Sequence, residues 1–209
     1  MSYNDKQIQI ISTAERLFSA KGFDGTSVRD IADEAGVNIA MISYYFGSKE
    51  KLMEALFDQR SNNVRLRVES LIQDETLDPF QKMESLVAGY IEKVMDKQKF
   101  FKIMICEQVI NKNPVIVNLI YDLKKRNVEE ISKLIKDGQQ KGVFKKNVDV
   151  LMLMNSLIGT ITQMMLTIDH YRELNDLQAI PDDQFLVQIK QKLSQHIKLL
   201  FKAQLSYEV

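Results

Sequence analysis

The chain has 209 residues, of which 45% are hydrophobic and 27% are charged, and its 28 basic and 28 acidic residues give zero net charge. This is the profile of a globular protein with a sizeable core, and the balance of charge argues against a grossly basic nucleic-acid protein. The lone Cys106 excludes an internal disulfide framework and indicates a reducing compartment. No signal-peptide pattern opens the chain, so we expect a cytoplasmic protein.

The first part of the chain carries apolar residues at helical spacing, interrupted by glycines and capping residues. We expect a first helix that stops at Gly22, a second from Thr26 or Ser27 to Gly36, a third from Asn38 to near Phe46, and a fourth from about Lys49 to Ile72.

Beyond a polar stretch at 73–79, the pattern predicts helices over 79–97, 98–111, 114–138, 148–172 and 182–205. No alternating strand pattern accompanies them, so the fold class is all-α. The uncharged segment 150–168 approaches the length that spans a bilayer, but polar residues such as Asn155 and Gln163 interrupt it. We therefore expect a buried helix and no membrane partner.

The second and third helices, joined by Ala35, Gly36 and Val37, match a helix-turn-helix. Gly36 permits the tight turn, and the small side chains of Ala32 and Ala35 permit close approach. The third helix is then free to enter a major groove, which admits one α-helix.

One side of that third helix is unusually apolar for a side that we expect to lie on the surface. Ile39 with Ser43 and Ala40 with Tyr44 are i, i+4 pairs on this side, and apolar contact with thymine methyl groups would explain it. The hydroxyl groups of Tyr44 and Tyr45 can donate hydrogen bonds to phosphates.

Charge is the main argument against this interpretation, because residues 1–60 hold seven basic and nine acidic side chains. Against this objection, the acids Asp30, Asp33 and Glu34 can lie on the far side of the second helix. Lys49 starts a helix whose N–H groups and dipole also attract a phosphate. Replacing Lys49 should weaken binding to every sequence and reduce its salt dependence.

The stretches TSVRDIA at 26–32, AGV at 35–37, YYF at 44–46 and SKEKL at 48–52 resemble the N-terminal signature of the TetR family of transcriptional regulators, over roughly residues 8–60. The resemblance implies a homodimer on a palindromic operator. It implies DNA contacts at Thr26, Ser27, Arg29, Asn38, Ile39, Ala40, Met41, Ser43, Tyr44, Tyr45 and Lys49. Two positions depart from the family: Ser43 stands where it often has tyrosine, and Tyr45 where it often has histidine.

The last two expected helices suit a dimer interface. The helix at 148–172 is apolar nearly all round and the helix at 182–205 is amphipathic, so the pair can form a four-helix interface with its copy. The alternative is that both pack only within one chain. The candidate interface residues are Leu157, Ile161, Met164, Met165, Phe185, Ile189, Leu193, Ile197 and Leu200.

A ligand cavity is expected among the helices between Phe80 and Ile168, with an apolar wall and few polar groups. Its candidate lining residues are Met83, Val87, Tyr90, Ile91, Phe101, Met104, Ile105, Gln108, Ile120, Tyr121 and Met152. The alternative for each of them is plain core. We expect a small apolar or weakly polar effector.

The sequence therefore predicts a DNA-binding regulator, a repressor released from its operator by the effector. Its helix-turn-helix domain covers residues 1–48, and a helical ligand-binding and dimerisation domain covers 49–209. The alternative is an all-α small-molecule carrier or enzyme whose helix-turn-helix is structural. An activator or an architectural DNA binder would share the same residues as a repressor. His170, His196 and Cys106 lie far apart without partners, so we expect no catalytic residue, metal or cofactor.

Overall fold

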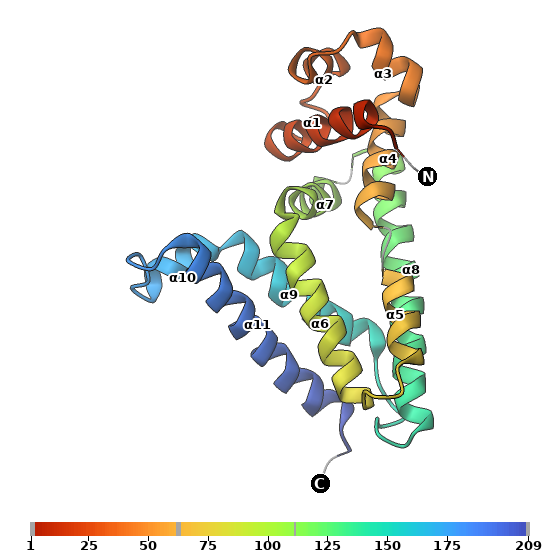
Figure 1. Cartoon of the computed structure of the whole chain (residues 1–209), viewed down its shortest axis with the longest axis vertical. Coiled ribbons are helices and arrows are strands. Elements are labelled where there is room, and N and C mark those ends of the chain that lie inside the picture. The colour runs from red at the N-terminus through yellow and green to blue at the C-terminus, as the bar shows by residue number, and fades with distance from the viewer. Residues whose placement is uncertain (1–2, 62–63, 111, 208–209) are drawn as a thin grey trace. The chain divides into compact units, whose positions relative to one another are not determined.

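The computed structural model describes residues 3–61, 64–110 and 112–207, and the regular elements in these ranges are α-helices (Figure 1). In chain order they are α1 (Asp5–Lys21), α2 (Val28–Ala35), α3 (Ile39–Phe46), α4 (Lys49–Ser61), α5 (Val64–Gln73), α6 (Pro79–Asp96), α7 (Gln98–Ile110), α8 (Pro114–Gln140), α9 (Val150–Leu166), α10 (Ile168–Leu174) and α11 (Asp182–Leu205). The predicted all-α fold class is confirmed.

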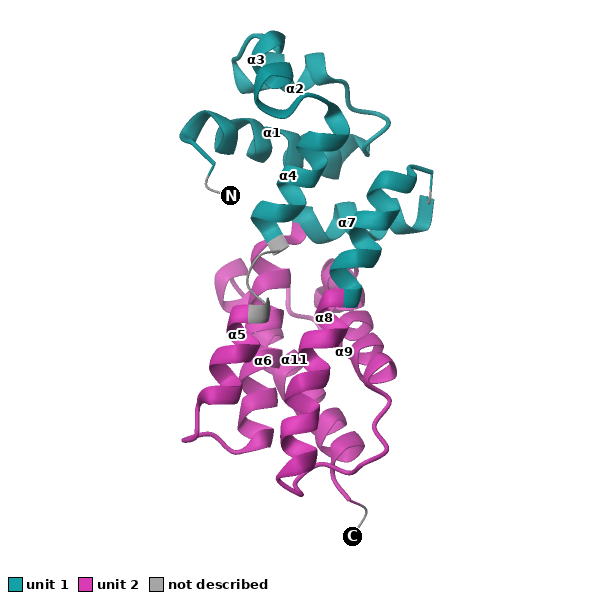
Figure 2. Ribbon diagram, turned by 90° about the vertical axis from the view of Figure 1, so that its right-hand side faces the viewer, with its two compact units in different colours: residues 1–62, 99–125 teal, residues 63–98, 126–209 magenta. Residues whose placement is uncertain are grey.

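The chain divides into two compact units, which Figure 2 colours separately. Unit 1 comprises residues 1–62 and 99–125, and unit 2 comprises residues 63–98 and 126–209. Unit 1 thus adds α4, α7 from residue 99 and the first part of α8 to the first three helices. The functional division between residues 48 and 49 concerns a different boundary and stays a prediction.

Helix α1 begins at a capping box. The side chain of Asn4 accepts a hydrogen bond from the N–H of Gln7 at 2.9 Å, and the side chain of Gln7 accepts one from the N–H of Asn4 at 3.0 Å. The helix ends before Gly22, whose φ of 75° favours glycine. Its inward face buries Ile10, Ile11, Ala14, Leu17 and Phe18.

The turn between α2 and α3 is set by a glycine and two caps. Ser27 and Asp30 form a capping box at the start of α2, and the side chain of Asn38 accepts a hydrogen bond from the N–H of Ala40 at 2.9 Å at the start of α3. Between these helices Gly36 adopts the left-handed conformation, with φ 62° and ψ 37°. The predicted helix-turn-helix is therefore present.

Helices α4 and α7 complete the core of unit 1. Leu52 and Leu56 of α4 are fully buried, and the ring of Phe57 packs edge-on against the ring of Phe100 from α7, with centroids 5.1 Å apart. This contact fixes α7 in the same unit as the helix-turn-helix.

In unit 2, α11 packs against α6 and α9. Its buried stripe consists of Phe185, Ile189, Leu193, Ile197, Phe201 and Leu205. On α8, Gly138 leaves room for the ring of Phe144, because a Cβ at this position would lie 2.2 Å from that ring. A substitution at Gly138 would therefore disturb the core.

Two predicted helices differ from the observed ones. The expected helix from Lys49 to Ile72 corresponds to α4 and α5, with residues 62 and 63 outside the described ranges. The expected helix over 148–172 is wrong, because α9 ends at Leu166 and α10 follows at an angle of 72°. Thr167, with φ −116° and ψ 20°, leaves the helical conformation at this bend. Within the described ranges no single helix is long and apolar enough to cross a membrane, and only the bent pair of α9 and α10 passes by length and composition.

Candidate nucleic-acid interface and ligand cavity

Helix α3 has an inward and an outward side. Ile42 is 1% exposed and holds α3 on the core of unit 1, whereas Ile39 is 45% and Tyr44 is 84% exposed. Ala40 and Ser43 are exposed as well. The four residues that sequence spacing places on one side are therefore accessible on α3.

Aromatic contacts order the end of α3. The rings of Tyr44 and Tyr45 meet edge-on with centroids 5.3 Å apart, and those of Tyr45 and Phe46 lie 6.3 Å apart. Tyr45 and Met41 are half-buried. Tyr44 is thus the aromatic side chain of this group with the greatest access to a partner.

The candidate DNA-contact residues around the start of α2 differ in their exposure. Arg29 is exposed, and Ser27 is exposed while it caps α2. Thr26 is 1% exposed, and its hydroxyl donates to the carbonyl oxygen of Gly22 at 2.8 Å. The Thr26 side chain therefore stabilises the loop before α2, and its access to DNA is small.

Lys49 lies at the start of α4 and its ammonium group points back to the same loop. Nζ donates to the carbonyl oxygens of Phe23 at 2.9 Å and of Thr26 at 3.0 Å, and it lies 4.1 Å from the centroid of the Phe23 ring. Two of its three donors are therefore engaged within unit 1.

Glu107 of α7 binds the same loop from the other side. Its side chain is 6% exposed, and Oε1 accepts a hydrogen bond from the N–H of Phe23 at 3.0 Å. Sequence reasoning missed this residue. The one available signal was an acid within the mostly apolar run of α7, where a carboxylate needs a donor if it is buried.

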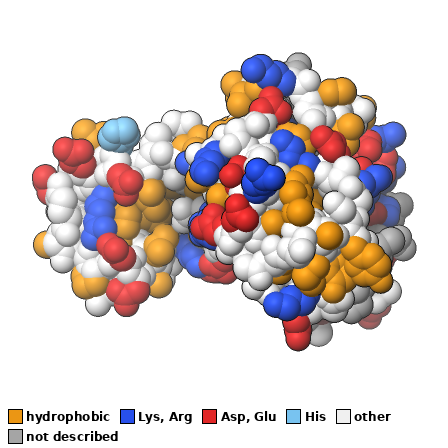
Figure 3. Space-filling model, turned by 90° about the horizontal axis from the view of Figure 1, so that it is seen from above, with side chains coloured by type: hydrophobic (Ala, Val, Ile, Leu, Met, Phe, Trp, Pro, Cys, Tyr) orange, Lys and Arg blue, Asp and Glu red, His pale blue; other side chains and the backbone are white. Residues whose placement is uncertain are grey.

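Charges of both signs are interspersed on the face shown in Figure 3. Two acids of α2 are engaged within unit 1: Glu34 pairs with Arg16, and the carboxylate of Asp30 accepts hydrogen bonds from the backbone and hydroxyl of Ser27, which lower its pKa. Asp30 therefore remains ionised and serves the capping box.

Unit 2 contains a cavity of about 220 Å³, which we call the apolar cavity. Its lining residues come from α5, α6, α8 and α9 and are Arg67, Leu86, Gly89, Tyr90, Lys93, Asn127, Ile131, Met154, Leu157 and Ile158. Burial raises the pKa of Tyr90, so its hydroxyl stays neutral, and burial lowers the pKa of Lys93. An apolar wall with a few polar groups suits a small molecule.

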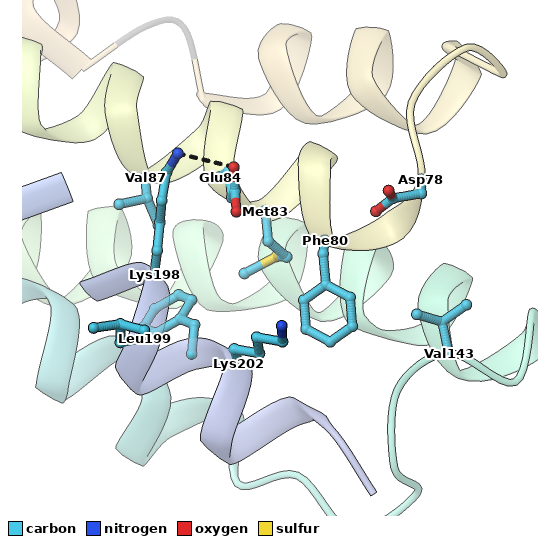
Figure 4. Close-up of a pocket in the computed structure, with 10 residues that line it drawn as sticks. Asp78, Phe80, Met83, Glu84, Val87, Val143, Lys198, Leu199 and Lys202 are labelled. Carbon is cyan, nitrogen blue, oxygen red and sulfur yellow. Dashed lines mark ion pairs between the residues drawn. The ribbon is translucent and has the colours of Figure 1, made fainter. Parts of the chain in front are cut away.

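A second hollow, of about 520 Å³, lies between α6 and α11 and is called here the α6–α11 groove (Figure 4). Its apolar lining residues include Phe80 and Leu199, while Lys198 forms an ion pair of 2.8 Å with Glu84 across it. Because the groove carries both acids and lysines, we regard the apolar cavity as the better candidate for an effector.

The predicted ligand residues are dispersed. Tyr90 lines the apolar cavity, Met83 and Val87 line the α6–α11 groove, and Ile91 is buried in unit 2. In unit 1, Phe101 and Ile120 are buried and Met104 and Ile105 are half-buried, whereas Gln108 and Tyr121 are exposed, as is Met152 of unit 2. Sequence reasoning missed Arg67, Lys93 and Asn127, because polar residues on an amphipathic helix look like a solvated face.

The predicted dimer residues lie mainly inside one chain. Leu157, Ile161, Met165, Phe185, Ile189, Leu193 and Ile197 are buried, and Met164 and Leu200 are half-buried. Apolar side chains on α9 and α11 thus pack these helices within the same chain, and their part in a dimer interface stays a prediction. The outward side of α9 carries a different set, namely Met152, Asn155, Gly159, Gln163 and Leu166.

Helix α3, the second helix of the helix-turn-helix, is exposed, and a separate helical unit contains a cavity. This combination is typical of DNA-binding transcriptional regulators. The family model described as bacterial regulatory proteins of the tetR family matches residues 10–56, and a model described as a tetracyclin repressor-like C-terminal domain matches residues 79–173. The chain belongs to the TetR family of transcriptional regulators, as its sequence predicted.

Three similar proteins illustrate the match. "Probable HTH-type transcriptional regulator YttP" of Bacillus subtilis is 57% identical over 51 residues, which are 24% of this chain and 25% of that protein. "Probable acrEF/envCD operon repressor" of Escherichia coli is 27% identical over 74% of this chain and 71% of its own length. The structure of the regulator FadR of Bacillus subtilis in complex with stearoyl-CoA has a TM-score of 0.66 and 21% identity, covering 91% of this chain and 96% of that one, so it shows the shared fold.

Proposed function

We propose that the protein is a sequence-specific transcriptional repressor, located in the cytoplasm, that binds a palindromic operator as a homodimer and is released by a small molecule. The observation that carries this proposal is the outward side of α3. Ile39, Ala40, Ser43 and Tyr44 are exposed on a helix whose position is fixed by the buried Ile42. A surface with apolar and hydroxyl groups fits base edges in a major groove.

The proposed DNA contacts fall into two groups, those to bases and those to phosphates. We assign base contacts to Ile39, Ala40 and Ser43, and phosphate contacts to Tyr44 and to the exposed Arg29. The predicted contacts at Ser27, Asn38, Met41 and Tyr45 remain part of the proposal as neighbours of this surface. Thr26 and Lys49 act in it chiefly by holding the loop before α2, since their polar groups are engaged there.

For the homodimer we propose the outward side of α9. Met152, Gly159 and Leu166 recur on it, with the polar Asn155 and Gln163 between them. A glycine such as Gly159 allows two helices to approach closely, and a two-fold axis would bring each α9 against its copy. Two-fold symmetry in the protein then requires a palindromic operator.

The apolar cavity is the proposed effector site. The solved FadR structure shows that a protein of this fold holds an acyl ligand, and relatives carry names such as repressor and fatty acid metabolism regulator. An effector that binds the DNA-free state more tightly shifts the population toward it. In a dimer this state would place the recognition helices away from the separation of about 34–36 Å that adjacent half-sites require.

The decisive experiment is selection of bound duplexes from a random DNA pool by the purified full chain. We expect an enriched motif with two-fold symmetry and binding that the variant Tyr44→Ala weakens. A matched control is Tyr121→Ala, since Tyr121 is another exposed tyrosine and lies outside the helix-turn-helix. No enriched motif at low salt would refute the proposal, and an enriched motif without symmetry would refute its dimeric form.

A further inference from the structure

We infer that the apolar cavity takes an amphiphilic anion, a molecule with an apolar body and one carboxylate or phosphate group, rather than a neutral compound. The inference rests on the proposed function, which assigns the effector to this cavity, and it names the chemical class of that effector. It departs from the apolar or weakly polar ligand that the sequence alone predicted.

The central observation is Lys93, which lines the apolar cavity without a partner. Its side chain is half-buried, and its ammonium group makes no hydrogen bond or ion pair with any residue that the structure describes. A partly desolvated cation is unfavourable unless an anion or acceptor approaches it. The cavity therefore has an unmet requirement for negative charge.

The acids on the same helix cannot meet this requirement, because α11 engages them. The three acids of α6 are Glu84, Glu92 and Asp96. Lys198 pairs with Glu84 at 2.8 Å, and Lys190 pairs with Glu92 at 2.5 Å and with Asp96 at 3.2 Å. The acids on the α11 side of α6 are thus already paired with lysines of α11. Lys93, on the cavity side, has no such pair among the described residues.

A second cation extends the positive end of the cavity. Arg67 of α5 lines it, and its Nη2 donates to the hydroxyl of Ser85 at 2.6 Å, while no other described residue engages its remaining guanidinium N–H groups. The side chains of Tyr90 and Asn127 add a hydroxyl and an amide to the lining. These groups can donate to the oxygens of a bound anion.

The rest of the cavity selects the apolar body of the ligand. Ile131, Met154 and Leu157 are buried, and Leu86 and Ile158 complete a wall without charge. A cationic amphiphile would be repelled by Lys93 and Arg67, because its head group carries the same positive charge. An anionic one gains a charge-assisted hydrogen bond of roughly 1.5–3 kcal/mol, which corresponds to about tenfold or more in affinity over a neutral analogue.

The test is isothermal titration of the full chain, without DNA, with four probes of the same chain length: octanoate, octyl phosphate, octanol and octylammonium. We expect octanoate, octyl phosphate or both to bind at least about tenfold more tightly than octanol, and octylammonium to bind most weakly. The variant Lys93→Met keeps the apolar stem and should remove most of the preference for the anion. The control Lys136→Met changes an exposed lysine of α8 that does not line the cavity, and the preference should persist.

The results separate the two proposals. If octanol binds as tightly as the anions, if no probe binds, or if the preference survives Lys93→Met in a folded protein, the inference about ligand class is wrong. Operator binding is measured without any probe, so a failed titration leaves the proposed DNA-binding function standing, and a failed operator selection leaves the binding of octanoate interpretable.

Discussion

The carboxylate of Glu107 in α7 accepts a hydrogen bond of 3.0 Å from the backbone N–H of Phe23, a residue 84 positions earlier in the chain. The carbonyl oxygen of the same Phe23 accepts a hydrogen bond of 2.9 Å from Lys49 of α4. One residue in the loop before α2 is thus held through both of its backbone polar groups by side chains of two other helices. The loop that positions the helix-turn-helix consequently depends on α4 and α7.

We expect Glu107→Leu to lower the free energy of unfolding by roughly 1–3 kcal/mol, because it leaves the buried N–H of Phe23 without an acceptor. Glu107→Gln keeps an oxygen at the same distance along the side chain and should recover most of this loss. Urea denaturation followed by circular dichroism measures both variants. Equal stability of the leucine variant and the wild type would show that the hydrogen bond contributes nothing.

Lys49→Met removes two hydrogen bonds to carbonyl oxygens and the contact with the Phe23 ring while it keeps the apolar stem. We expect operator affinity to fall by a similar factor at every salt concentration, because the loop is loosened and no phosphate contact is lost. Fluorescence anisotropy over a salt series measures this. A slope of log affinity against log salt that becomes shallower by about one per protomer would instead identify Lys49 as a phosphate contact, as the sequence predicted.

The outward side of α3 makes a prediction about the operator. If Ile39 and Ala40 contact thymine methyl groups, replacing a contacted thymine by deoxyuridine removes one buried methyl group and should weaken binding by about fourfold, near 0.8 kcal/mol. The same replacement at a position outside the half-sites is the control. Competition between the two duplexes measures the difference, and equal affinity at every thymine of the half-site would exclude methyl recognition.

The fold was predictable where the sequence has strong local signals. Gly36 and the caps at Ser27 and Asn38 mark helix ends through backbone geometry and short-range hydrogen bonds, and the structure places the helix-turn-helix there. The break at Thr167 was missed, because a threonine in an apolar run is compatible with a continuous helix, and the sequence contains no glycine or proline at that point.

The site was less predictable because burial and pairing depend on distant residues. The apolar stripe of α11 is the same pattern whether it faces α6 or a second subunit, so periodicity could not separate core from dimer interface. Helix α6 carries two lysines, Lys82 and Lys93, which differ in what surrounds them. Lys82 donates to the carbonyl oxygen of Ile72, whereas Lys93 lines a cavity whose described lining residues include no acid. These are tertiary relationships, and a single sequence does not record them.

Gly159 gives a direct test of the proposed dimer surface. A Cβ built at this position meets no atom within 4 Å, so the single chain tolerates a larger side chain there. We expect Gly159→Arg to fold normally but to fail to dimerise, since two arginines would meet at the two-fold axis. Light scattering should then give a mass near 24.2 kDa. Ala88→Arg, which adds the same side chain at an exposed position of α6, should remain dimeric, and a dimeric Gly159→Arg would refute this surface.

The titration of Lys93 predicts how affinity for octanoate depends on pH. Burial and the neighbouring Lys97 lower the pKa of Lys93 below its ordinary value of 10.5, whereas burial raises the pKa of Tyr90. Octanoate favours the protonated lysine, so its binding raises the pKa of Lys93. Affinity should be highest below the pKa of free Lys93 and fall as the pH rises from that pKa to the pKa of the bound form. Titrations at about pH 7 and about pH 10 measure the fall, and circular dichroism checks that the protein stays folded. Lys93→Met should bind weakly at both pH values with no such fall, and an equally steep fall in this variant would assign the dependence to another group.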